Sequence, residues 1–270
     1  MKLNGTSSNA LPKVNGVHNH DKQVSQASIT PTNKKKQVKE TKAKLQPAKQ
    51  NTKQEQEENL QLIGENHVAT SIETPLRKDA FELNDATKIE KIAEHFKEIM
   101  NILGLDLTDD SLQGTPKRVA KMYVQEIFKG LDPENKPPTK MFENKFGYNQ
   151  LLVEKDISFH SHCEHHFVPI HGKAHIAYIS NGGVIGLSKL HRIVDYFARR
   201  PQVQERLTNQ IGEELKKMLG TEDVAVVLDA AHMCVSMRGI KDQTSTTITS
   251  FYSGKFNEEA TRSEFLRYIQ

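Results

Sequence analysis

Tryptophan is absent from this chain of 270 residues, and no phenylalanine or tyrosine occurs before Phe81. The first 80 residues therefore lack the large apolar side chains that a packed core requires. They are rich in Lys, Gln, Asn, Thr and Ser, a composition that predicts a disordered N-terminal extension over residues 1–80. All seventeen aromatic residues follow, so the folded domain is expected to span residues 81–270.

Cysteines and long apolar runs are also scarce. Two cysteines, Cys163 and Cys234, are too few for a disulfide framework and favour a metal or catalytic role in a reducing compartment. No apolar run approaches the roughly 18 residues that span a bilayer, and the N-terminus lacks the apolar segment of a signal peptide. These absences predict a soluble, cytoplasmic protein without a membrane partner.

The formal net charge of +3 is unevenly distributed along the chain. Residues 34–53 hold eight lysines and a single acid, Glu40, so the basic character belongs to the extension. This lysine run contains no arginine and no aromatic side chain that could stack on a base. We therefore expect the extension to bind nucleic acid or an acidic surface only weakly.

Hydrophobic periodicity predicts helices first and strands later. Helical spacing begins at Thr87, where Glu90 completes a capping-box pattern, and again at Thr115-Pro116. Strand patterns and three further helices follow; the helices are expected from Ser188, from Pro201 to Gly220 and over 258–269, and the strands over 151–159, 173–179, 184–187, 224–237 and 244–252. This order predicts an α+β fold with a mainly antiparallel sheet.

Residues 160–166 read His-Ser-His-Cys-Glu-His-His and hold four of the twelve histidines. Imidazole and thiolate together are ligands that zinc prefers, and Cys163 and His166 stand at C-x-x-H spacing. Cys234, projecting from a strand, would be the third ligand. Three ligands leave one tetrahedral position for water, as in a catalytic zinc site. The alternatives are a closed structural site, with His165, His162 or His160 as fourth ligand, and no metal at all.

Proton-transfer and anion-binding residues surround these ligands in the sequence. His165 is the natural general acid or base if His166 binds the metal, and His232 shares a strand face with Cys234. A carboxylate at Gln204-Glu205, in the first turn of a helix, could accept hydrogen bonds from an amino-pyrimidinone edge such as that of guanine. Phosphate groups would be favoured at the helix start at Ser188-Lys189, with Arg192 one turn later. Arg238 follows Cys234 closely and could reach the same pocket.

Four sequence blocks, in this order and spacing, resemble GTP cyclohydrolase I. They are Cys-Glu-His-His (163–166), Val-Ile-Gly-Leu-Ser-Lys (184–189), Arg-Pro-Gln-Val-Gln-Glu-Arg-Leu-Thr (200–208) and His-Met-Cys-Val-Ser-Met-Arg-Gly (232–239). Residues 115–123 and 262–266 match as well. The resemblance covers roughly residues 85–270 and excludes the extension.

This resemblance implies the tunnelling fold, an antiparallel sheet with helices on one face, which assembles into a toroidal decamer with sites at subunit interfaces. It also implies that GTP and water yield formate and 7,8-dihydroneopterin triphosphate. Zinc on Cys163, His166 and Cys234 would activate the water that attacks carbon 8 of the guanine. The other implied roles are proton transfer by His165 and His232, action near the ribose by Ser188, anchoring of the pyrimidine edge by Glu205 with Gln204, and triphosphate binding by Lys189, Arg192 and Arg238, with Arg118 and Lys121 as further candidates.

Two other interpretations remain open at the level of sequence. The chain could be a noncatalytic, zinc-stabilised binding module that docks on nucleic acid through its lysine tail, or a related tunnelling-fold enzyme acting on another purine or pterin. His160 and His162 have no assigned role, and His162 departs from the apolar residue usual in the family. The product could feed folate or tetrahydrobiopterin synthesis, and a regulatory protein could bind.

Overall fold

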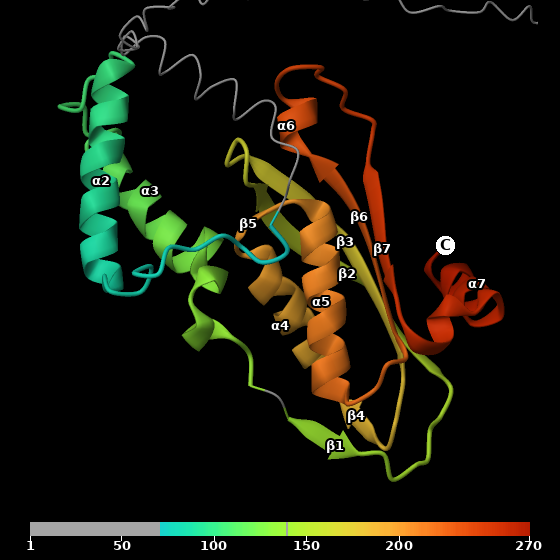
Figure 1. The fold of residues 1–270 in the computed structure, drawn as a ribbon. Helices are drawn as coiled ribbons and strands as arrows, with labels where there is room; N and C mark the ends of the chain where they lie inside the picture. Colours follow the sequence, from blue (N-terminus) through green and yellow to red (C-terminus); the bar gives the residue numbers. More distant parts are fainter. Residues whose placement is uncertain (1–70, 139) are drawn as a thin grey trace, which may run out of the picture. The chain divides into compact units, whose positions relative to one another are not determined.

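The computed structural model describes residues 71–138 and 140–270, so most of the predicted extension lies outside the described residues. Helices precede and interrupt a sheet (Figure 1). The elements are α2 (Asp85–Ile102), α3 (Thr115–Met122), β1 (Met141–Glu143), β2 (Leu151–Cys163), β3 (Pro169–Ile179), β4 (Gly183–Ile185), α4 (Leu187–Ala198), β5 (Pro201–Gln202), α5 (Gln204–Leu219), β6 (Val224–His232), α6 (Met233–Ser236), β7 (Thr247–Tyr252) and α7 (Glu259–Ile269).

The main sheet has the strand order β5-β2-β3-β6-β7. Its neighbours pair antiparallel except for the short β5, which runs parallel to the end of β2. The β2–β3 register shifts between Glu154 and Ile157, where Asp156 has a φ of 60°. The predicted α+β class with mainly antiparallel pairing is therefore confirmed. No helix of the described residues is long and apolar enough to cross a membrane.

Helices α4 and α5 cover one face of this sheet (Figure 1). On β6 the residues that face them alternate with those that do not, as a strand buried on both faces requires. The shared core contains Leu190 and Ile193 from α4, Leu207, Ile211 and Leu215 from α5, and Ile176, Val226 and Leu228 from the strands. This apolar layer fixes α5 against the strands that carry the site.

Helix α7 packs on the opposite face of the sheet. Phe256 and Phe265 are fully buried there and form a second cluster with Ala177, Ala225 and Val227, the residues that alternate with those of the first core. Helix α7 therefore departs from the expected arrangement of an antiparallel sheet with helices on one face. Because side chains alternate along each strand, Ala177 of β3 and Ala225 and Val227 of β6 point to this face and pack against the two phenylalanines.

Several element boundaries differ from the predicted ones. The N-cap of α2 is Asn84, whose side chain accepts the N–H of Thr87 at 2.9 Å, so Thr87 lies inside the first turn. Ser188 does not cap α4, because that helix begins at Leu187 after Gly186. Pro201 does not open α5 either: it belongs to β5, and the extended Val203 precedes the helix.

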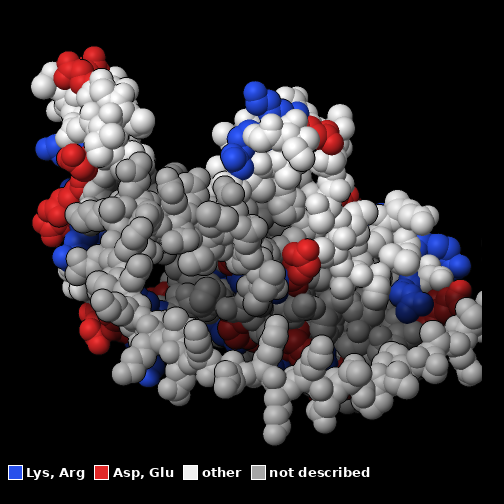
Figure 2. Space-filling view, turned by 45° about the horizontal axis from the view of Figure 1, so that its top comes forward, with Lys and Arg blue, Asp and Glu red and all other residues white. Residues whose placement is uncertain are grey.

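Charged residues of both signs are mixed along α2. Lys88, Glu90, Lys91 and Glu94 alternate in its sequence, and basic and acidic side chains lie side by side over this helix in Figure 2. A mixture of this kind gives no extended field of one sign, which is what a phosphate backbone would require. The described part of α2 therefore offers no electrostatic basis for binding nucleic acid.

Candidate metal centre

The C-terminal ends of β2 and β6 lie at the same end of the sheet. Strand β3 separates them, with Pro169 opposite His162 on β2 and Ile170 opposite His232 on β6. The chain leaves β2 at Cys163 and enters a short loop, while it leaves β6 at His232 and enters α6. This topology brings the two cysteines together although they are far apart in the sequence.

The ligand atoms of Cys163, His166 and Cys234 all lie within 4.8 Å of one another. The Cys163 Sγ to His166 Nδ1 distance is 3.9 Å, close to the roughly 3.5–3.8 Å edge of a tetrahedral zinc site with Zn–S and Zn–N bonds of ordinary length. Two thiols and one imidazole are a donor set suited to a borderline-soft ion. The group could therefore hold a metal ion.

Cys234 reaches this group differently from the predicted way. It lies on α6, a single helical turn, and not on the strand that was expected to continue to Met237. Burial and the neighbouring Cys163 raise the pKa of the Cys234 thiol. A cation between the two sulfurs would reverse this effect, because it favours the thiolate.

The loop after β2 is compact and held by backbone hydrogen bonds. The Cys163 N–H donates to the Val168 carbonyl at 2.9 Å, and the Phe167 N–H donates to the Cys163 carbonyl at 2.8 Å. Phe167 has a φ of 53°, in the left-handed region that closes such turns. His165 projects beside the ligands, with its Nδ1 3.7 Å from Cys163 Sγ.

His232 is held by a side chain of α5. Its Nε2 lies 2.6 Å from Oε1 of Gln204, a residue only 2 % exposed. Burial lowers the pKa of His232, and the carboxylate of the exposed Glu205 partly offsets this. Of the predicted pair of histidines, His165 lies on the loop beside Cys163, and His232 lies at the end of β6, two residues before Cys234.

Among the predicted cation positions, Arg238 reaches the ligands. Its Nη1 lies 2.9 Å from Nε2 of His166. Ser188, Lys189 and Arg192 lie in the first half of α4, and within the described residues no hydrogen bond or ion pair joins them to the ligand group. Arg118 on α3 donates instead to the Ser111 carbonyl and the Thr115 hydroxyl.

The two unassigned histidines lie on β2 and outside the ligand group. His160 pairs across the strands with His171, and their rings stack at a centroid distance of 6.4 Å. His162 is 8 % exposed and packs edge-on against Phe128, and burial lowers its pKa. Neither joins the three ligand atoms within the described residues, so His160 and His162 do not complete a four-ligand site.

Sequence reasoning missed the partner of Glu164. The buried guanidinium of Arg206 forms a two-point ion pair with this carboxylate, with Nη1 to Oε2 at 2.6 Å and Nη2 to Oε1 at 3.2 Å. Both residues stand inside the matched sequence blocks, but 42 positions separate them. Nothing in either block indicated that they meet.

Fold and site together define an α+β protein with a Cys–His–Cys group that could hold a metal ion. The chain belongs to the GTP cyclohydrolase I family, whose sequence pattern matches residues 92–270. A GTP cyclohydrolase 1 of Flavobacterium johnsoniae is 56% identical over 214 residues, 79% of this chain and 96% of that protein. Those of Yersinia enterocolitica and Escherichia coli O1:K1 are each 52% identical, covering 78% and 77% of this chain and 95% of their own lengths. The predicted family and enzyme class are confirmed.

Proposed function

We propose that this chain hydrolyses GTP, opens the imidazole ring of its guanine and releases formate and 7,8-dihydroneopterin triphosphate. The observation that carries this proposal is the convergence of Cys163, His166 and Cys234 within 4.8 Å, in a chain of the GTP cyclohydrolase I family. The relatives named GTP cyclohydrolase 1 support the same reaction in pterin biosynthesis. The cytoplasm, where GTP is available, would be its location.

Zinc is the ion proposed for the three ligands. When bound, it supplies Lewis acidity that activates water near neutral pH. Binding at either nitrogen of His166 conflicts with the present contact between that ring and Arg238: metal on Nδ1 leaves the proton on Nε2, and metal on Nε2 displaces the guanidinium. Metal binding would therefore free Arg238 to hold the triphosphate of the substrate.

The two histidines would move protons on either side of the guanine. His165 projects from the loop beside Cys163 and would protonate the imidazole-ring nitrogen as that ring opens. His232 would assist from β6, where Gln204 fixes its ring. The exposed carboxylate of Glu205, one residue further along α5, would accept hydrogen bonds from the pyrimidine edge.

The remaining substrate residues lie on α4. Ser188 would act near the ribose, and Lys189 and Arg192 would bind the triphosphate with Arg238. Since no described contact links the first three to the metal ligands of the same chain, we propose that a second copy supplies them at a subunit interface. A toroidal decamer of tunnelling-fold subunits would provide such interfaces, and a regulatory protein could bind to its exposed faces.

Formate release from GTP, measured together with the zinc content of the same sample, tests the proposal. We expect formate and, after oxidation, a fluorescent pterin, both lost on chelation and in Cys163→Ser. The matched control is His171→Ala, which removes an exposed histidine of β3 whose ring stacks on His160, outside the ligand group. A zinc-loaded protein that binds GTP but releases no formate would contradict the proposal.

A noncatalytic zinc module is the competing function. It predicts that Cys163→Ser unfolds the domain and that nucleic-acid binding weakens steeply with salt and disappears without the lysines of residues 34–53. His165→Ala separates the two possibilities. It should abolish turnover with zinc retained if the chain is the enzyme, and change little if it is the module.

A further inference from the structure

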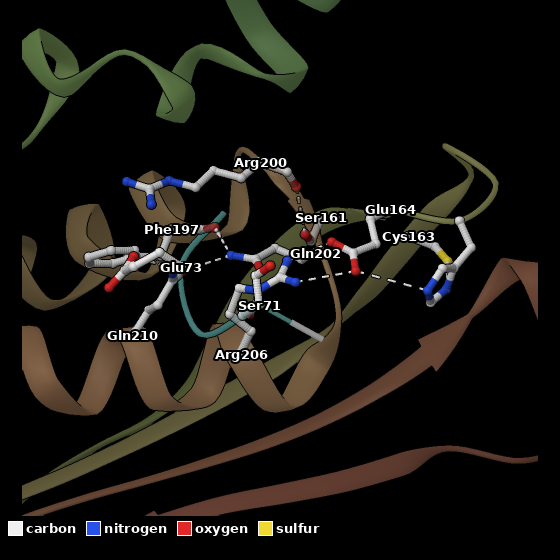
Figure 3. Close-up of polar contacts among 11 residues, drawn as sticks. Ser71, Glu73, Ser161, Cys163, Glu164, Phe197, Arg200, Gln202, Arg206 and Gln210 are labelled. Carbon is white, nitrogen blue, oxygen red and sulfur yellow. Dashed lines mark hydrogen bonds and ion pairs between the residues drawn. The ribbon is translucent and has the colours of Figure 1, made fainter. Parts of the chain in front are cut away.

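A buried ion pair holds the loop after β2 at Glu164. Arg206 of α5, with a side chain only 3% exposed, points at Glu164, and Figure 3 shows its guanidinium lying between Glu164 and Ser71. Two parallel N–H donors meeting two carboxylate oxygens fix both side chains in one plane. Glu164 is the residue directly between Cys163 and His165, so its position determines the course of the loop.

The Nε–H of Arg206 contacts a segment of the chain that precedes α2. Arg206 Nε donates to the Ser71 carbonyl at 2.7 Å, and one turn later on α5 Gln210 Nε2 donates to Oε2 of Glu73 at 2.9 Å (Figure 3). Residues 71–73, the first described residues of the chain, thus lie along α5. We call them the N-terminal strap.

The same network also holds the main chain of Glu164. Its N–H donates to the Gln202 carbonyl at 3.0 Å, and the Gln202 side chain donates to Oε1 of Gln210 at 2.9 Å. Gln210 therefore contacts Glu73 of the strap through its amide nitrogen, and Gln202, which holds the loop, through its amide oxygen. Displacing the strap would disturb both attachments of Glu164.

The carboxylate of Glu164 continues this chain of contacts to His165. Its Oε1 lies 3.9 Å from His165 Nε2, while Nδ1 of the same ring faces Cys163 Sγ at 3.7 Å. A fixed negative charge at this distance attracts the ring N–H and favours one orientation of the imidazole. The orientation of His165 would thereby depend on Glu164 and on the groups that hold its carboxylate.

We propose that Glu164 and Arg206 are positioning residues for His165 and that the N-terminal strap completes their network. This inference rests on the proposed role of His165 as the proton donor. The contacts of Ser71 and Glu73 tie the site to residues 71–80, the last segment of the predicted N-terminal extension. A change in that segment is thus transmitted to the metal loop through Arg206 and Gln210.

Glu164→Gln tests the positioning role with the least disturbance of packing. The amide oxygen keeps one acceptor for Arg206, but the carboxylate charge beside His165 is lost. We expect kcat to fall about tenfold or more, with KM for GTP and zinc content nearly unchanged, since only proton delivery is affected. A loss of zinc in proportion to kcat would instead indicate a structural role and overturn the inference.

The role of the strap is tested by exchanging the amide and the carboxylate of the Gln210–Glu73 pair. Gln210→Glu keeps the acceptor for Gln202 but sets a carboxylate against Glu73, and we expect faster amide hydrogen exchange over residues 163–168 and a lower kcat. Adding Glu73→Gln recreates the same amide–carboxylate pair in reverse, so both readouts should return toward the wild-type values. Unchanged exchange in the single variant, or no rescue in the double variant, would overturn the role of the strap.

His165→Ala distinguishes a failure of this inference from a failure of the proposed function. If His165→Ala keeps wild-type turnover, the proposed role of His165 fails and the inference fails with it. If His165→Ala abolishes turnover while Glu164→Gln keeps the wild-type kcat, the proposed function stands and the positioning role alone is refuted. Reduced kcat in both variants with full zinc content supports both.

Discussion

Nε2 of His232 lies 2.6 Å from Oε1 of Gln204, and the nitrogen of the same amide donates to two backbone carbonyls, those of Leu228 at 3.3 Å and Thr247 at 2.8 Å. Because both carbonyls can only accept, the amide oxygen must face His232, and the neutral imidazole must carry its proton on Nε2. One side chain of α5 thereby sets the tautomer of a histidine on β6. The Nδ1 atom of His232 is left as an acceptor.

Replacing Gln204 by Met should therefore impair turnover more than substrate binding. The variant keeps the volume of the side chain but loses the acceptor that orients His232, so we expect kcat to fall about 10- to 100-fold with zinc content unchanged. The carbonyl of the buried Leu228 also loses this donor, as does that of Thr247, which should cost about 1–3 kcal/mol of unfolding free energy. Steady-state kinetics and urea unfolding measure the two effects.

The control for this variant is Asn209→Ala, which changes an exposed position of the same helix. It should leave both kcat and the unfolding free energy close to the wild-type values. A Gln204→Met variant with wild-type kcat would show that His232 needs no fixed orientation.

The sequence alone located most elements, because apolar residues alternate along the strands and recur every three to four residues in the helices. It failed where an element changes without a change of pattern. The apolar alternation of β6 continues through Cys234, but the chain turns into α6 after His232. A single helical turn buries too little to leave its own periodicity.

The ligand set was predictable because its residue types are rare, whereas the support of the site was not. Glutamate and arginine are common surface residues, and nothing marks Glu164 and Arg206 as partners until β2, β5 and α5 have packed. The placement of α7 was likewise inaccessible, since its residue pattern shows an apolar stripe but not the face of the sheet that receives it.

Replacement of His165 by alanine should lower kcat far more than replacement of His160. His165 lies beside Cys163, whereas His160 lies outside the ligand group and stacks on His171. We expect His165→Ala to lower kcat by about 100-fold or more with zinc retained, as for a general acid, and His160→Ala to change it less than twofold. Formate release under saturating GTP checks both. Equal losses in the two variants would mean that the effect is not specific to proton transfer.

His175 should make the stability of the domain depend on pH. It is buried on β3, where its Nδ1 accepts the N–H of Asp156 at 3.3 Å, and burial lowers its pKa below the ordinary 6.5. Above pH 6.5 the ring is neutral in both the folded and the unfolded chain. Below pH 6.5 the unfolded chain binds the proton first. The unfolding free energy therefore decreases as the pH is lowered, until the pH has passed the lower pKa of the folded state.

His175→Gln should therefore flatten the fall in stability between pH 7.5 and 5, because the amide oxygen accepts the same N–H and does not titrate. Urea unfolding followed by far-UV circular dichroism at each pH measures the slope. His171→Gln on the same strand, where the ring is exposed, controls for the loss of a histidine. An unchanged slope in His175→Gln would exclude this residue as the cause.

Gly172 should tolerate no side chain. A Cβ at this position of β3 would collide with the backbone of β6 at Asp229 and Ala230. Because backbone in the middle of a sheet cannot yield, Gly172→Ala should destabilise the domain by about 3 kcal/mol or more. Gly186→Ala is the matched control, since a Cβ there meets only the Phe142 ring at 3.6 Å. Similar unfolding midpoints for the two variants would contradict the close approach.

Removal of the metal should abolish turnover but leave the fold intact. The three ligands lie at the ends of β2 and β6, whereas the main core between the sheet, α4 and α5 is built from buried apolar side chains that need no ion. Chelation should therefore stop formate release with little change in far-UV circular dichroism, and added zinc should restore it whereas magnesium should not, because thiolates bind magnesium poorly. In a closed structural site, the same treatment would unfold the domain. Loss of the helical signal on chelation would thus favour the structural role over the catalytic one.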